Sequence, residues 1–150
     1  MIEMSLNGQD DSELLKIRMK KIREMAGKLS ADKLSTEPVD VTDGEFSNFI
    51  EKHRLAIVDC WAAWCAPCRI LSPIIDQLAK EYAGRIAFGK LNVDENPSTA
   101  SKFSIMSIPT ILVFHKGILV DKLIGVHPYQ ILKTRIEDYL NRFEGSQEKS

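Results

Sequence analysis

Residues 55–61, LAIVDCW, are apolar at almost every position, and Asp59 is the single charged residue among them. A strand with one face in water alternates apolar and polar residues, whereas this stretch would present apolar side chains on both faces. Such a strand belongs in the centre of a sheet that is covered on both sides. We therefore expect an α/β domain with helices on both faces of its sheet.

The sequence after Pro38 alternates between strand and helix patterns. A short strand, PVDV, is followed by a predicted helix over about 43–52, for which Thr42 and Glu45 would form a capping box. Pro67 would open a second helix at its first turn. The buried face of that helix is expected to carry Ile70, Leu71, Ile74, Leu78 and Tyr82.

The remaining elements continue this alternation and end in a hairpin. RIAFGKLNVD predicts a strand and NPSTASKF a short helix, and the strands TILVF and ILVDKLIG are joined by HKG, where Gly117 tolerates positive φ. Pro128 would open a last helix, with Leu132, Ile136, Tyr139 and Phe143 on one face. Helix-linked strands followed by a hairpin predict a mixed sheet with helices on both faces.

Residues 1–37 are polar and charged and lack a strand pattern. After a disordered start, a basic amphipathic helix is predicted over about 13–29, where one stripe carries Leu15, Met19, Ile22, Ala26 and Leu29. Three interpretations stay open for it: a solvated tail or a helix packed on its own domain, a docking helix for a partner or for self-association, and weak attachment to anionic membrane or nucleic acid. A linker, a domain over 38–145 and a polar tail over 146–150 would follow.

The composition is that of an ordinary globular protein, with 44% apolar residues, 27% charged residues and a net charge of −1. No basic excess indicates nucleic acid, and no apolar run approaches the roughly 18 residues that span a membrane. The N-terminus lacks the apolar core of a secretory signal and is too acidic for a transit peptide. The odd count of three cysteines argues against a secreted disulfide scaffold. We therefore expect a cytoplasmic protein.

All three cysteines lie in VDCWAAWCAPC, residues 58–68, and Cys65 and Cys68 are spaced C-x-x-C. Zinc needs at least three protein ligands, and without a second C-x-x-C or paired histidines we expect no metal. A structural disulfide in so short a loop would add little stability. At a strand-to-helix corner, orphan amides, the helix dipole and nearby Arg69 would favour a thiolate at Cys65, which indicates redox chemistry. Cys68, one helical turn further in, would be the less exposed.

The segment DCWAAWCAPCRILSP resembles the active site of the thioredoxin family, which usually contains W-C-G-P-C. The resemblance covers about 38–143 and includes KLNVDENP, SIPT before the hairpin and Gly125 after it. It implies a thioredoxin fold and a protein-disulfide reductase and electron carrier that uses a reversible Cys65–Cys68 pair and no cofactor. The chain departs from the family in Ala66, where glycine is usual, in Cys60, where an aromatic residue is usual, and in its N-terminal region.

The resemblance assigns Cys65 as the attacking thiolate and Cys68 as the resolving thiol. Asp59 corresponds to a buried carboxyl with a raised pKa that accepts the proton of Cys68; the alternative is a carboxylate at the strand end that faces solvent or caps the next helix. Lys90 corresponds to the lysine that pairs with this Asp, and the alternative is an ordinary surface lysine.

Pro109 corresponds to the family's cis-proline, which would expose backbone groups near Ile108 to an extended client strand; the alternative is a trans-proline at a strand edge. The expected apolar client surface, with Trp61 left in the core, comprises Trp64, Ala66, Pro67, Ile108, Pro109 and Gly125. The implied partners are disulfide-containing client proteins and a thioredoxin reductase or equivalent electron donor.

No histidine lies between the two cysteines, unlike in strongly oxidising relatives, so we expect a reductant. The rival functions are a thiol oxidant or isomerase, and a thioredoxin-fold adaptor that docks through residues 13–29. Cys60 should point to the strand face opposite Asp59 and pack as a small apolar residue. A second redox role for Cys60 is the alternative.

Overall fold

The computed structural model describes residues 36–149, with side chains as far as Phe143. The helix predicted over 13–29 lies outside the described residues, and the division of the chain at residues 37 and 145 stays a prediction. The elements are β1 (Val39–Asp40), α2 (Phe46–Lys52), β2 (Leu55–Trp61), α3 (Ala66–Glu81), β3 (Ala87–Asn92), α4 (Pro97–Lys102), β4 (Thr110–His115), β5 (Ile118–Ile124) and α5 (Tyr129–Lys149). Their order is the one that the sequence predicts.

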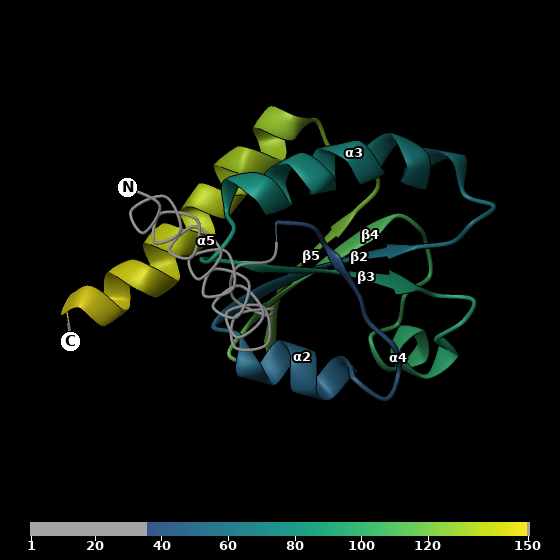
Figure 1. The fold of residues 1–150 in the computed structure, drawn as a ribbon, viewed down its shortest axis with the longest axis horizontal. Coiled ribbons are helices and arrows are strands. Elements are labelled where there is room, and N and C mark those ends of the chain that lie inside the picture. The colour runs from purple at the N-terminus through teal and green to yellow at the C-terminus, as the bar shows by residue number, and fades with distance from the viewer. Residues whose placement is uncertain (1–35, 150) are drawn as a thin grey trace, which may run out of the picture. The chain divides into compact units, whose positions relative to one another are not determined.

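The five strands form one mixed sheet in the order β1-β3-β2-β4-β5 (Figure 1). The central strand β2 pairs parallel with β3 and antiparallel with β4. Every residue of β2 except Trp61 is buried, as its apolar run predicts. The β4–β5 hairpin turns through Lys116 and Gly117, both with positive φ, which is the conformation that two-residue hairpin loops favour.

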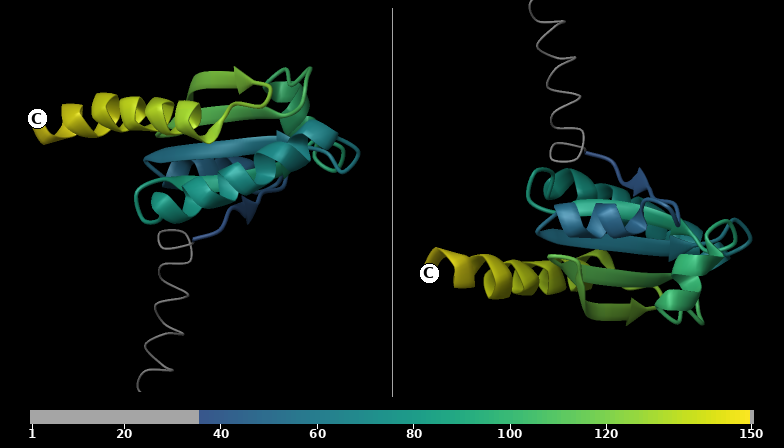
Figure 2. Two further views of the ribbon diagram at one scale, coloured as in Figure 1. Left: turned by 90° about the horizontal axis from the view of Figure 1, so that it is seen from above. Right: turned by 90° about the horizontal axis from the view of Figure 1, so that it is seen from below.

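Helices cover both faces of this sheet, as the views from above and below show (Figure 2). On one face, Leu71 of α3 and Ile136 of α5 belong to the same core cluster as Ile57 of β2. On the other face, Phe46 of α2 packs in a second cluster, and α4 lies on this side as well (Figure 1). Because side chains alternate along a strand, β2 directs Asp59 toward α3 and the next residue toward α2.

Two details of the predicted helices are wrong. The chain forms a turn over 43–45 before α2 begins at Phe46, and the N-cap Glu45 makes no capping hydrogen bond. Thr42 instead donates a hydrogen bond to the Glu45 carboxylate at 3.0 Å, so no capping box forms. On α3, Ile70 is 62% exposed, and Ile75 takes the buried place because the apolar stripe lies slightly further round the helix.

The last helix, α5, packs against the sheet through the face that the sequence predicts. Leu132, Ile136 and Tyr139 are buried, and Phe143 packs against the same cluster while remaining partly exposed. Within residues 36–149, no helix combines the length and the apolar character that a membrane crossing requires.

Candidate active site

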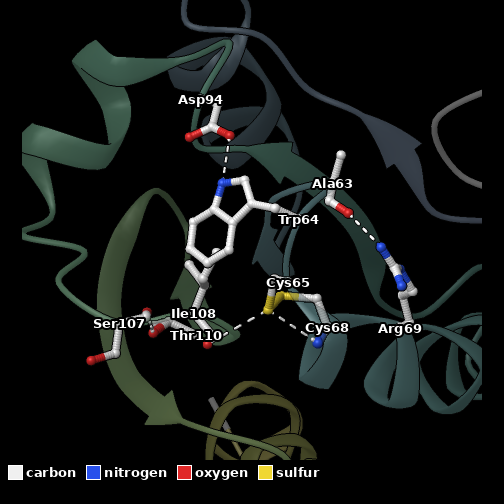
Figure 3. Close-up of a disulfide and its surroundings, with 9 residues drawn as sticks. All are labelled: Ala63, Trp64, Cys65, Cys68, Arg69, Asp94, Ser107, Ile108 and Thr110. Carbon is white, nitrogen blue, oxygen red and sulfur yellow. Dashed lines mark hydrogen bonds between the residues drawn. A yellow bond between two sulfur atoms is a disulfide. The ribbon is translucent and has the colours of Figure 1, made fainter.

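The two cysteines of the C-x-x-C motif lie where the chain leaves β2 and enters α3 (Figure 3). Cys65 is the N-cap residue of α3 with an extended backbone. Pro67 occupies the first turn, where its missing N–H removes no helical hydrogen bond. Cys68 follows within the same turn, and a disulfide joins the two residues with their Cα atoms 5.3 Å apart. The motif therefore forms one closed disulfide at a helix N-terminus.

The sulfur of Cys65 has polar backbone groups beside it (Figure 3). The N–H of Cys68 donates a hydrogen bond to this sulfur at 3.2 Å, and the carbonyl oxygen of Ile108 lies 3.8 Å from it. An amide at a helix N-terminus stabilises negative charge, so the position suits a thiolate. The guanidinium of Arg69 binds the carbonyl oxygen of Ala63 at 2.9 Å, which fixes that charge on the loop before Cys65.

The expectation that Cys68 is the less exposed cysteine is wrong in this disulfide form. Cys65 is 3% exposed and Cys68 is 4% exposed. The bond between them holds both residues in one small cluster with Ala62, against which Ile108 also packs. Exposure therefore does not distinguish the two thiols, whereas the amide hydrogen bond to Cys65 does.

The loop beside the disulfide carries Ile108 and Pro109, and the peptide bond between them is cis, as the family resemblance predicts. The Pro109 ring is fully buried, so the prediction that it forms part of the exposed client surface is wrong. Gly125 donates its N–H to the carbonyl oxygen of Pro109 at 2.8 Å, and the Thr110 hydroxyl donates to the carbonyl oxygen of Ser107 at 2.5 Å. Hydrogen bonds thus hold this loop on both sides of the proline.

The other residues predicted for the client surface lie on the outside of the site. Trp64 is 69% exposed, and its indole N–H donates to the carboxylate of Asp94 at 2.9 Å (Figure 3). Ala66 and Pro67 are exposed, and Ile108 and Gly125 are partly exposed. Trp61, expected in the core, is only partly buried.

Exposed apolar residues beside the motifs lie outside the predicted client surface, and Ile70 and Met106 are two examples. Ile70 follows Cys68 by two positions and was assigned to the core, and Met106 precedes Ile108 by two positions and is 91% exposed. A signal in the sequence is their position, because Ile70 and Met106 each lie within two residues of a motif.

Asp59 and Cys68 line the same cavity, which has a volume of about 220 Å³. Asp59 is 1% exposed, and its Oδ1 atom has no hydrogen-bond partner within the part of the chain that the structure describes. Burial raises the pKa of the Asp59 carboxyl from 3.8 to about 6, while the charge of Lys90 lowers it and that of Asp76 raises it. The predicted burial of the Asp59 carboxyl is therefore confirmed and the solvent-facing alternative is wrong, while its role as proton acceptor stays a prediction.

Lys90 lies opposite Asp59 in the β2–β3 register, but the predicted pairing takes another form. The Lys90 ammonium donates a hydrogen bond to the Ser72 hydroxyl at 2.6 Å and forms its ion pair with Asp76 at 3.7 Å. Lys90 therefore acts on Asp59 through its charge, without a direct ion pair. Ser72 was missed from the sequence, although the spacing Cys68, Ser72, Asp76 places all three on one helix face.

Cys60 is fully buried on the opposite face of β2, in the core cluster of α2. Burial raises the pKa of the Cys60 thiol to about 12, which keeps it protonated and agrees with the predicted packing role. Among residues 36–149, no group of three or more His, Cys, Asp or Glu residues is placed to hold a metal ion.

The comparisons with known proteins agree with this geometry. The family model described as Thioredoxin matches residues 37–138, which include every site residue discussed above. A thioredoxin of Staphylococcus saprophyticus is 47% identical over 102 residues, which cover 68% of this chain and 97% of the relative. A thioredoxin of Alicyclobacillus acidocaldarius is 44% identical over 100 residues, covering 67% and 95%. A solved structure of a mutant thioredoxin from Halobacterium salinarum matches with a TM-score of 0.65 at 31% identity, covering 69% of this chain and 91% of that one.

Proposed function

Because the chain belongs to the thioredoxin family and is a thiol–disulfide oxidoreductase, we propose that Cys65 attacks the disulfides of client proteins and that Cys68 resolves the product. The Cys65 thiolate bonds to one client sulfur, and the other client sulfur leaves and takes up a proton. Cys68 then attacks Cys65, closes the Cys65–Cys68 disulfide and releases the second client thiol. The client gains two electrons and the protein loses two, which a reductase must restore.

Asp59 is proposed as the group that accepts the proton of Cys68 during the second step. Its support is the shared cavity, because the side chains of Asp59 and Cys68 both line this one space. A carboxyl whose pKa lies near 6 can both accept and return a proton close to neutral pH. Lys90 is proposed to modulate this carboxyl from the neighbouring strand.

Clients are proposed to bind over Trp64, Ala66, Pro67, Ile108 and Gly125, with the Pro109 ring beneath. An extended client segment would lie beside Ile108, whose carbonyl oxygen is 3.8 Å from the Cys65 sulfur. The exposed side chains here are apolar, so binding depends on apolar contact and backbone hydrogen bonds more than on charge. This fits a protein that reduces many different disulfide-containing clients.

The direction of electron flow is proposed to be that of a reductant that works in the cytoplasm. Ala66 and Pro67 place no cation between the cysteines, so the thiolate is less strongly favoured and the disulfide is harder to reduce than in oxidising relatives. Measurement of the reduction potential against glutathione tests this directly. A potential well above the glutathione couple would assign the chain as a thiol oxidant instead.

The observation that carries the proposed function is the Cys65–Cys68 disulfide at the N-terminus of α3, beside Ile108. Insulin reduction driven by dithiothreitol is its test, with Cys65→Ser expected to abolish the reaction. Cys68→Ser should trap a mixed disulfide with insulin, and Cys60→Ala is the matched control that should react normally. Full activity of Cys65→Ser would overturn the role of Cys65, whereas an unchanged chain with no activity above the dithiothreitol background would favour the adaptor function through residues 13–29.

A further inference from the structure

Lys90 is the one residue shared by two neighbouring hollows. The inner hollow is the cavity of about 220 Å³ that Asp59 and Cys68 line. The outer hollow, of about 340 Å³, is more open and is lined by Glu37, Pro38, Asp40, Asp76, Lys80 and Lys90. The Lys90 side chain therefore lies at the boundary between the inner hollow, which Asp59 lines, and the outer hollow.

Two residues of α3 contact the Lys90 ammonium: Ser72, which lines the inner hollow, and Asp76, which lines the outer hollow. Ser72 lines the inner cavity and accepts a hydrogen bond at 2.6 Å, whereas Asp76, one helical turn later, lines the outer hollow and lies 3.7 Å away. The Asp76 side chain is 51% exposed and that of Lys90 is 20% exposed. The Ser72 hydroxyl thus holds the Lys90 ammonium toward the inner cavity, while the Asp76 carboxylate attracts it toward the outer hollow.

We propose that Ser72 is a positioning residue for the disulfide exchange: its hydroxyl holds the Lys90 ammonium on the inner side, against the attraction of Asp76, and so sets how readily Asp59 accepts the proton of Cys68. The inference rests on the proposed function of Asp59 as proton acceptor. Ser72 is one helical turn from Cys68 and acts on the chemistry only through Lys90.

The charges that face Asp59 come from two elements. Beyond the effect of burial, the charge of Lys90 on β3 lowers the pKa of Asp59, and that of Asp76 on α3 raises it. Also on α3, Arg69 lines the cavity while its guanidinium binds the carbonyl oxygen of Ala63, and Cys68 is held in the disulfide. The residue opposite Asp59 on β4 is Ile111, which carries no charge. Because the Asp59 Oδ1 atom has no hydrogen-bond donor among residues 36–149, its affinity for a proton depends on burial and on these charges. In a buried site a small movement of one ammonium changes such an interaction strongly.

Two substitutions on the same helix face should therefore shift the titration of Asp59 in opposite directions. Ser72→Ala lets the Lys90 ammonium move toward Asp76 and the outer hollow, away from Asp59. The positive charge then stabilises the Asp59 carboxylate less, so its pKa rises by roughly half a unit or more. Asp76→Asn removes the outward attraction and a like charge, so the pKa of Asp59 falls. Ser72→Thr keeps the hydroxyl and should leave the pKa close to that of the unchanged protein.

Carbon-detected NMR titration of the Asp59 carboxyl in the oxidised full chain measures these shifts without reference to activity. Alanine is a good helix former, so Ser72→Ala should keep the fold, which its thermal unfolding checks. An unchanged or lowered Asp59 midpoint in Ser72→Ala overturns the proposal. So does a Ser72→Thr variant that shifts as far as Ser72→Ala, because the hydroxyl would then not be the group that matters.

The pH profile of insulin reduction separates this inference from the proposed function. If Asp59 is the proton acceptor, the profile should move to higher pH in Ser72→Ala and to lower pH in Asp76→Asn. If the NMR midpoints move as expected while the profile stays fixed, Ser72 does position Lys90, and the role of Asp59 as proton acceptor is wrong.

Discussion

The backbone N–H of Cys68 donates a hydrogen bond to the sulfur of Cys65 at 3.2 Å. Among the described residues, no group donates a hydrogen bond to the sulfur of Cys68. The first amides of α3 thus favour negative charge on one sulfur of the pair, although both residues are buried to the same degree. This asymmetry supports the proposed roles of Cys65 as nucleophile and Cys68 as resolving thiol better than exposure does.

The first prediction is that Cys65 is alkylated before Cys68 in the reduced protein. The amide that stabilises its thiolate increases the reactive fraction of Cys65 at neutral pH. Reaction with less than one equivalent of iodoacetamide, followed by peptide mass spectrometry, should find most of the label on Cys65. Label found mainly on Cys68 would reverse the proposed order of attack.

The second prediction concerns Cys60, which should stay unreactive while the protein is folded. It is fully buried, and burial raises the pKa of its thiol to about 12. Titration of the reduced protein with a thiol reagent should therefore find at most two reactive thiols under native conditions and a third only in denaturant. Rapid native labelling of Cys60 would contradict its assignment to the core and reopen the question of a second redox role.

The fold followed from the sequence because its strongest signals are local. The apolar run of β2, the glycine of the β4–β5 turn, the proline in the first turn of α3 and the proline before α5 each constrain a few neighbouring residues, and their order leaves little choice of topology. The errors fall where local patterns compete. Thr42 and Glu45 have capping-box spacing, but the turn over 43–45 brings their side chains together instead.

The site was only partly predictable, because some of its contacts join distant parts of the chain. The disulfide and the cis bond before Pro109 follow from motifs of a few residues. The partners of Lys90 do not, since Ser72 and Asp76 reach it from a helix 18 and 14 residues away in sequence. The family resemblance paired Lys90 with Asp59, and only the packing of α3 over the sheet shows that its ammonium binds α3 instead.

The third prediction is that Gly89→Ala destabilises the fold. A Cβ atom at Gly89 would lie 2.9 Å from Cγ2 of Val41 and 3.0 Å from Cε2 of Phe49, both in the core on the α2 side. Overpacking of this kind costs about 1–3 kcal/mol, which urea unfolding can measure. Gly44→Ala is the matched control, because its Cβ meets nothing within 4 Å. Equal free energies of unfolding for the two variants would contradict this prediction and would show that Val41 and Phe49 move aside at little cost.

The last prediction concerns the effect of pH on stability through Asp59. Its folded-state pKa, about 6, lies above the ordinary value of 3.8, so the folded protein holds this proton more tightly than the unfolded chain does. The unfolded chain therefore binds fewer protons between these two values, and the free energy of unfolding falls as pH rises through this range. The difference amounts to roughly 3 kcal/mol for this one group.

Asp59→Asn removes the charge while keeping the shape of the side chain. Its unfolding free energy should therefore lack the Asp59 contribution, so it should fall less than that of the unchanged protein between pH 3.8 and about 6 and be higher at neutral pH. Insulin reduction should become slower in the same variant, because Cys68 loses its proton acceptor. Urea unfolding across this pH range provides the measurement, with Asp94→Asn as a control carboxyl beside the site. An Asp59→Asn variant with an unchanged pH dependence of stability would mean that Asp59 is ionised in the folded protein well below pH 6.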